Sequence, residues 1–153
     1  MFFLIFFFAI SSISGDISIP TTFGSGAEST SFAVLYKNKI KFSIKNSSIL
    51  PDEIILDSKT TLTLNNKNAS CSAIDAFCQS IESLWAKNST LQSRRYSIKA
   101  LRLIYPTILK LNKLSQSDRD NLLLGSNYAG KAINITKTTA PHAFSYYLTA
   151  IHN

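Results

Sequence analysis

The feature that most constrains the fold of this chain is a helical repeat of apolar residues between positions 74 and 85. The apolar residues recur at intervals of three and one, which places them on one face of an α-helix. They are Ile74, Phe77, Cys78, Ile81, Leu84 and Trp85. The repeat predicts that this face is buried, and it leaves Asp75, Gln79 and Glu82 on a neighbouring polar stripe.

Two side chains of that stripe, Asp75 and Gln79, are four residues apart. Oxygen atoms one helical turn apart can reach a single point, which is the arrangement that a helix needs to offer two ligands to one metal ion. Polar residues four positions apart also occur on any helix that exposes one face to solvent. The pair alone therefore leaves two interpretations open, a metal site and a solvated helix face.

Composition and charge narrow the classes of partner. The 153 residues are 45% hydrophobic and 16% charged, which is typical of a globular protein. The formal net charge of +7 would permit contact with nucleic acid, anionic lipid or an anionic substrate such as a phosphonate. However, the cations are spread along the chain, and Arg95, Lys99 and Arg102 fall at the spacing of a solvated helix face. We therefore expect neither a nucleic-acid partner nor a membrane.

The first ten residues are almost wholly apolar and are followed by small residues. The run is shorter than the roughly 20 apolar residues that span a bilayer, and no Lys or Arg precedes it as in a signal peptide. It is interpreted either as the leader of a secreted or membrane-attached protein or as a misassigned or decayed start. The second interpretation is preferred, so a cytoplasmic protein is expected. Cys71 and Cys78 are expected to be reduced, because seven helical residues separate them by about 10.5 Å along the axis.

Local patterns predict strands before residue 66 and helices after it. Alternating residues predict short strands at 31–36 and 40–44, joined at residues 38–39. Helices are expected from about residue 68, over 91–111, over 119–132 and from Pro141 onward. The second is expected to kink or break near Pro106. The third is expected to start at an N-cap at Ser117–Asp118 and to be interrupted or loosened near Gly125 and Gly130.

Three segments in a fixed order resemble a known family. They are Ile19-Pro-Thr-Thr-Phe-Gly-Ser-Gly-Ala-Glu28, Asp75-Ala-Phe-Cys-Gln-Ser-Ile-Glu82 and a segment around Pro141-His142. Their order and spacing resemble those of the iron-containing (group III) alcohol dehydrogenases, and they look closest to a subgroup that reduces phosphonoacetaldehyde. The resemblance runs from about Ile19 to Asn153.

The resemblance implies an α+β fragment, in which short strands end an α/β nucleotide-binding domain and an incomplete, mostly α-helical metal-binding domain follows. The implied division is an apolar segment of uncertain status at 1–18, a remnant of the dinucleotide-binding domain at 19–65 and the first part of the metal-binding domain at 66–153. Family members have about two full domains, so the chain is expected to be truncated at both ends. The glycine-rich phosphate turn and the last metal-binding His are expected to lie outside it, and the chain alone is expected to lack turnover.

The resemblance also implies a divalent metal, either iron or zinc, with Asp75, Gln79 and His142 at the positions of its ligands. Gln79 stands where the family has a His. An amide oxygen is a weaker donor to such ions than imidazole, so a low affinity or a metal-free site is expected. Tyr146 stands where many members place a second, catalytic His, and no catalytic residue is assigned.

The implied cofactor is NAD or NADP, and the implied reaction is hydride transfer between it and a small aldehyde or alcohol, with phosphonoacetaldehyde as a candidate. The residues that match the family's nucleotide contacts are Thr21, Thr22, Gly24, Ser25, Lys41 and Leu64. Gly24 and Gly26 would let the backbone approach the cofactor closely. A homo-oligomer is compatible with the resemblance. The alternative is a catalytically inactive remnant or a helical interaction module.

Overall fold

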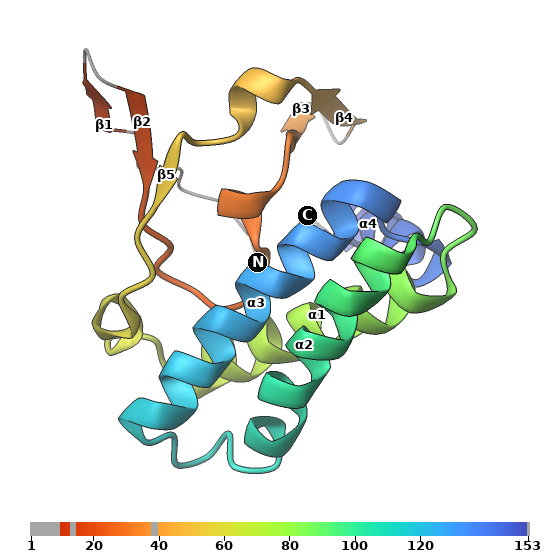
Figure 1. Ribbon diagram of the computed structural model, residues 1–153. Helices are drawn as coiled ribbons and strands as arrows, with labels where there is room; N and C mark the ends of the chain where they lie inside the picture. The colour runs from red at the N-terminus through yellow and green to blue at the C-terminus, as the bar shows by residue number, and fades with distance from the viewer. Residues whose placement is uncertain (1–9, 13–14, 38–39, 153) are drawn as a thin grey trace.

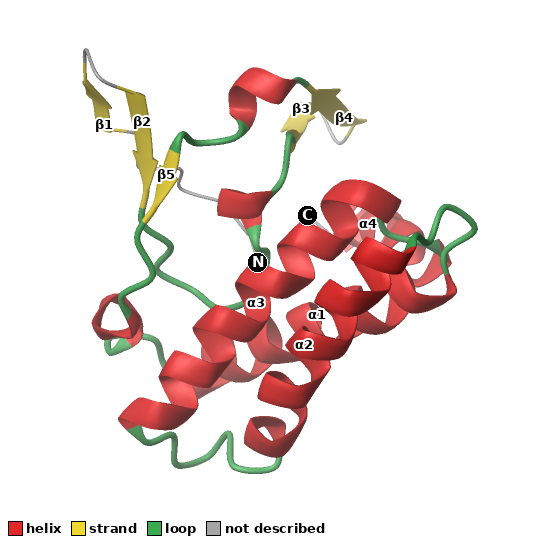
Figure 2. Cartoon of the chain, in the orientation of Figure 1, coloured by secondary structure: helices red, strands yellow, loops and turns green. Residues whose placement is uncertain are grey.

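Short strands occupy the first part of the chain and helices the rest, with the strands gathered on one side of the helices (Figures 1 and 2). The computed structural model describes residues 10–12, 15–37 and 40–152. It confirms the predicted class, an α+β fold that is mostly helical. The predicted joint at 38–39 and nearly all of the apolar start, residues 1–9, lie outside the described residues.

The helical part is built from α1 (Asn66–Trp85), α2 (Leu91–Ile108), α3 (Gln116–Thr136) and α4 (Ala140–His152). Helices α1, α2 and α3 pack against one another in pairs. Side chains cap the first turn of these three helices: Asn65 accepts from the Asn68 amide, while Thr90 and Ser115 head capping boxes. These caps satisfy amides that have no partner within the helix, and they fix where each helix begins.

The strands form two small sheets. β1 (Ile10–Ser12) pairs antiparallel with β2 (Gly15–Ser18), which pairs parallel with β5 (Glu53–Ile54). β3 (Phe32–Lys37) and β4 (Ile40–Lys45) form an antiparallel hairpin, as predicted. Short 3-10 helices lie at Ala27–Ser29, Ser47–Ile49 and Ser58–Thr61.

Three predictions about these helices are wrong, namely an interruption of α3, its N-cap and a break of α2 near Pro106, whereas a kink in α2 stays a prediction. Helix α3 runs without interruption through Gly125 and Gly130, and its N-cap is Ser115. A Cβ at position 125 would stand 2.5 Å from Cγ1 of Ile104 in α2, so glycine there permits close helix packing instead of ending the helix. Helix α2 continues through Pro106, but it ends two residues later, at Ile108.

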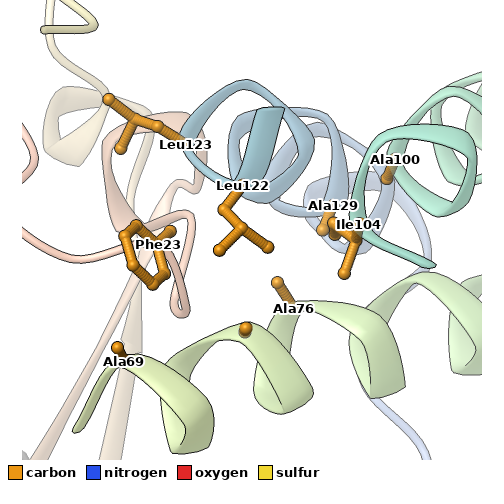
Figure 3. Packing of buried hydrophobic residues seen from close by; sticks show 9 residues of the cluster. Phe23, Ala69, Ala76, Ala100, Ile104, Leu122, Leu123 and Ala129 are labelled. Atoms are coloured by element: carbon orange, nitrogen blue, oxygen red, sulfur yellow. The ribbon is translucent and has the colours of Figure 1, made fainter. Parts of the chain in front are cut away.

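The core lies between α1, α2 and α3, and Phe23 from the segment before the first 3-10 helix closes it (Figure 3). Phe23 is fully buried. The other buried members of this core cluster are all small or aliphatic: Ala69, Ala73, Ala76, Ala100, Ile104, Leu122, Leu123 and Ala129. The segment that carries Phe23 is therefore anchored on the helical part of the molecule.

The predicted buried face of α1 is wrong at Ile74 and Trp85, whereas Phe77 packs against the core. Ile74 is 47% exposed and Trp85 is 62% exposed. The buried stripe of α1 consists instead of small or polar residues: Ala69, Ser72, Ala73, Ala76, Gln79, Ser80, Glu82 and Ser83. The backbone of Gly24 lies so close to α1 that an added Cβ would stand 2.8 Å from Cβ of Ser72, which leaves room only for small side chains there.

Within the part of the chain that the structure describes, no helix is both long and apolar enough to cross a membrane.

Candidate metal and nucleotide site

Helix α1 and the start of α4 bring Asp75, Gln79 and His142 together. His142 Nε2 lies 3.0 Å from Asp75 Oδ1, and Gln79 Nε2 donates to Asp75 Oδ2 at 3.1 Å. Gln79 is almost fully buried, whereas the Asp75 side chain is 37% exposed. The three positions predicted as metal ligands thus converge from two helices, while metal binding itself stays a prediction.

A second carboxylate, Glu82, lies on the other side of the His142 ring from Asp75. Its Oε1 contacts His142 Nδ1, and its Oε2 accepts from the amide of Thr139 at 2.5 Å and from its hydroxyl at 2.7 Å. Glu82 is only 1% exposed. Sequence reasoning placed Glu82 on the polar stripe of α1 but did not assign it to the site. Its position, one turn beyond Gln79 on that same stripe, was the available sign.

The two carboxylates favour positive charge at the imidazole between them. Burial alone would lower the pKa of His142, but the hydrogen bonds and charges of Asp75 and Glu82 outweigh it and raise that pKa above its ordinary value. A positive charge at Nε2, whether a proton or a metal cation, is therefore stabilised here.

The donor atoms of the site fit a divalent cation. Among the described residues, Gln79 Oε1 is a buried acceptor that has no hydrogen-bond partner. Such atoms are rare, and leaving one unsatisfied costs about 1–3 kcal/mol. Two donors that each lie about 2.0–2.2 Å from one ion are roughly 3 Å apart when they meet at a right angle, and Asp75 Oδ1 and His142 Nε2 have this separation.

The third donor is nevertheless weak. No group of three or more His, Cys, Asp or Glu side chains suited to a metal ion occurs within residues 10–12, 15–37 and 40–152. The site offers one carboxylate and one imidazole, and a neutral amide stands at the third position. A divalent ion would therefore be held less tightly than by three charged or imidazole donors.

The residues predicted to bind the nucleotide lie on several elements. Thr21 is exposed, and Thr22 and Ser25 are half-buried in the segment before the first 3-10 helix. Leu64 packs against the helical core, and Gly24 is pressed against Ser72, so packing accounts for both residues without a cofactor. Nucleotide contacts from these residues stay a prediction.

The two remaining predicted positions are described only in their backbone. Lys41 lies in β4, opposite Tyr36 of β3, and Tyr146 lies within α4. The side chains of both are outside the described part of the structure, so the predicted contact of Lys41 with a nucleotide stays open.

Sequence reasoning also missed a buried polar pair next to a surface cleft. Asn127 Nδ2 donates to Glu28 Oε1 at 3.1 Å. Glu28 is one of the residues that line a cleft of about 370 Å³, together with Leu50, Gln92, Tyr96, Lys131 and Asn134. Burial raises the pKa of Glu28, and the hydrogen bond from Asn127 offsets only part of that effect. Asn127 and Glu28 are 99 residues apart, so no local pattern connects them.

Comparison with known proteins identifies the family. Residues 15–58 match the model of the iron-containing alcohol dehydrogenases, and residues 69–153, more than half of the chain, match the model of the C-terminal part of that family. The phosphonoacetaldehyde reductase of Streptomyces viridochromogenes is 30% identical over 87% of this chain and 35% of its own length. The chain therefore spans about a third of the length of the curated relatives it matches.

Comparison with solved structures supports the same family. The iron-containing alcohol dehydrogenase of Thermotoga maritima is 27% identical with a TM-score of 0.82, over 88% of this chain and 37% of that one. The sulfoacetaldehyde reductase of Bifidobacterium kashiwanohense, solved in complex with NAD+, is 29% identical with a TM-score of 0.81, over 89% of this chain and 37% of that one. With both the sequence models and the fold in agreement, this chain belongs to the iron-containing alcohol dehydrogenase family.

Proposed function

We propose that this chain is the metal-binding part of an NAD(P)-dependent alcohol dehydrogenase that reduces a small aldehyde to an alcohol. The observation that carries the proposal is the meeting of Asp75, Gln79 and His142 across α1 and α4. When bound there, a divalent ion, iron or alternatively zinc, supplies a Lewis acid for a carbonyl oxygen, and the reduced nucleotide supplies the hydride.

The residues of this chain have distinct tasks in the proposed site. Asp75 contributes a negative charge and His142 a nitrogen donor, while the unpartnered oxygen of Gln79 contributes a neutral third donor. Six residues are proposed to contact the nucleotide. Four lie in the segment before the first 3-10 helix, one lies in β4 and one in the loop before α1: Thr21, Thr22, Gly24, Ser25, Lys41 and Leu64.

The proposed substrate is an aldehyde that carries an anionic group, with phosphonoacetaldehyde as the first compound to test. Two relatives are named for phosphonoacetaldehyde and sulfoacetaldehyde, both of which have such a group. The net charge of +7 on this chain supports the same substrate class, because a basic surface attracts anions. We also propose that the protein is cytoplasmic, since Cys71 and Cys78 are both free, and that it forms a homo-oligomer.

Calorimetry with Zn²⁺, and with Fe²⁺ under anaerobic conditions, tests the metal site. We expect one binding event in the wild type and its loss in Asp75→Asn. Glu53→Gln is the matched control, because it removes one negative charge from an exposed residue of β5, away from the site. Equal affinities in the two variants would contradict the proposal.

Oxidation of NADH or NADPH in the presence of phosphonoacetaldehyde tests whether the chain turns over by itself. We expect none, because the chain spans about a third of the length of its relatives, and oxidation that Asp75→Asn abolishes would contradict this expectation. Absence of metal binding in the calorimetry would favour the alternative, an inactive remnant or a helical interaction module.

A further inference from the structure

Glu82 is almost completely buried, and both of its carboxylate oxygens have polar partners within the protein. One oxygen contacts His142 Nδ1, and the other accepts two hydrogen bonds from Thr139. Because a buried carboxylate is costly unless its oxygens are paired, these contacts explain how the side chain is kept inside.

The partners of Glu82 lie at the start of α4. The Ala143 amide donates to the Thr139 carbonyl at 3.2 Å, so Thr139 is the N-cap residue immediately before α4, which begins at Ala140. A carboxylate at the N-terminal end of a helix accepts from free amides and is stabilised by the helix dipole. Glu82 therefore fixes the position of α4 and the ring of His142 at the same time.

The contact with Glu82 also decides which nitrogen of His142 carries the proton in the neutral ring. Both ring nitrogens face a carboxylate, which can only accept, so the neutral ring has one proton for two acceptors. Water can donate to Asp75, whose side chain is 37% exposed, whereas Glu82 is 1% exposed and depends on the ring, so the proton is on the Nδ1 that faces Glu82. The lone pair is then on Nε2, which faces Asp75 Oδ1 at 3.0 Å. Two acceptors at this distance repel each other unless a cation or a further proton lies between them.

We propose that Glu82 is the positioning residue of this site, which holds His142 in the Nδ1-protonated form and so presents the Nε2 lone pair toward Asp75 and a divalent ion. The proposal rests on the proposed metal site. It adds a residue that touches neither ion nor substrate and that acts through the imidazole.

Glu82→Gln tests the proposal because it keeps the size of the side chain and reverses the polarity at one atom. The amide oxygen of Gln can replace Oε2 as the acceptor from Thr139, which leaves the amide NH₂ facing His142 Nδ1. That nitrogen must then accept, so the proton moves to Nε2 and is donated to Asp75. We expect the affinity for Zn²⁺ to fall by about 10- to 100-fold, as is typical when a residue behind a metal ligand is changed.

Thr139→Val is the matched control. It removes the hydroxyl that donates to Glu82 but keeps the backbone amide and leaves the contact between Glu82 and His142 intact. If Glu82 served only to anchor α4, Thr139→Val would lose at least as much affinity for Zn²⁺ as Glu82→Gln, whose amide oxygen can still accept from Thr139. We expect its affinity to stay close to that of the wild type.

The ¹⁵N NMR spectrum of the imidazoles provides a readout that an anchoring role would not move. The chain has two histidines, so a His152→Gln variant identifies the signals of His142. At a pH where the ring is neutral and without metal, we expect the proton on Nδ1 in the wild type and in Thr139→Val, and on Nε2 in Glu82→Gln.

Three results would overturn the proposal: a proton on Nε2 in the neutral wild-type ring, an unchanged ring form in Glu82→Gln, or equal losses of Zn²⁺ affinity in the two variants. The wild-type spectrum decides the first even if Glu82→Gln does not fold. If the wild type binds no metal, the proposed function fails, but the ring form still tests the positioning by Glu82 separately.

Discussion

Replacing Gln79 with Met should cost little stability in the metal-free protein, although Gln79 is a buried polar residue of the core helix α1. The substitution removes the unpartnered Oε1, which relieves about 1–3 kcal/mol. It also removes the hydrogen bond from Nε2 to Asp75, which would be worth about 1.5–3 kcal/mol if Asp75 were left dry. Because the Asp75 side chain is 37% exposed, water can replace that bond and the loss falls below this range.

The two effects nearly cancel, so the free energy of unfolding of Gln79→Met should lie within about 1 kcal/mol of the wild type. With Zn²⁺ present, the wild type should become more stable to unfolding than Gln79→Met. An ion at 100 times its dissociation constant stabilises the wild type by about 2.7 kcal/mol, and Gln79→Met should gain less because it lacks the third donor.

Urea unfolding in EDTA and again with Zn²⁺ measures both quantities. Gln92→Met is the control, since Gln92 is an exposed glutamine of α2 and its replacement should change stability by less than about 0.5 kcal/mol with or without the ion. The reasoning is refuted if metal-free Gln79→Met is less stable than the wild type by more than about 2 kcal/mol, or if Zn²⁺ stabilises it as much as the wild type.

Three further predictions concern single positions. Gln79→His should tighten the binding of divalent metal, because imidazole is the stronger donor, and an unchanged affinity in calorimetry would count against the convergence of the three ligands. Phe23→Ala should lower the free energy of unfolding by about 3–5 kcal/mol, since the ring is fully buried between the helices; a loss below about 1 kcal/mol in urea unfolding would show that the segment is not anchored there. Glu28, whose pKa is raised by burial, should make the protein lose stability as the pH rises from below the ordinary value of 4.5 through the raised folded-state pKa. In Glu28→Gln that loss should disappear, and an unchanged pH profile of unfolding would contradict the buried carboxyl as its source.

The meeting of Asp75 and His142 could be anticipated only from the order of the motifs. Helical periodicity places Asp75 and Gln79 on one stripe, but it does not tell which distant segment faces that stripe. The resemblance to a family identified the segment around His142, and the structure brings its ring to Asp75 across 67 residues of chain. Glu82 was not assigned to the site from the sequence, because a charged residue on a polar helix stripe resembles a solvent-exposed one until its partners are known.

The buried face of α1 was mispredicted for a different reason. Periodicity arguments give most weight to large apolar side chains, whereas the closest approach of two elements is decided by small ones. Ser72 and Ala76 are buried, while Ile74 is exposed. The same applies to Gly125, where local propensity suggests a loosened helix and the fit against α2 requires a residue without a side chain.

The contact between Gly26 and Gly130 limits how this molecule can move. The backbone of Gly26, at a φ of 56°, lies so near α3 that an added Cβ would stand 2.6 Å from Cα of Gly130. Together with the buried ring of Phe23, this close approach holds residues 23–29 against the helices. Any movement of the two small sheets relative to the helices must then bend the chain outside residues 23–29, and Thr21 and Thr22 come immediately before that stretch.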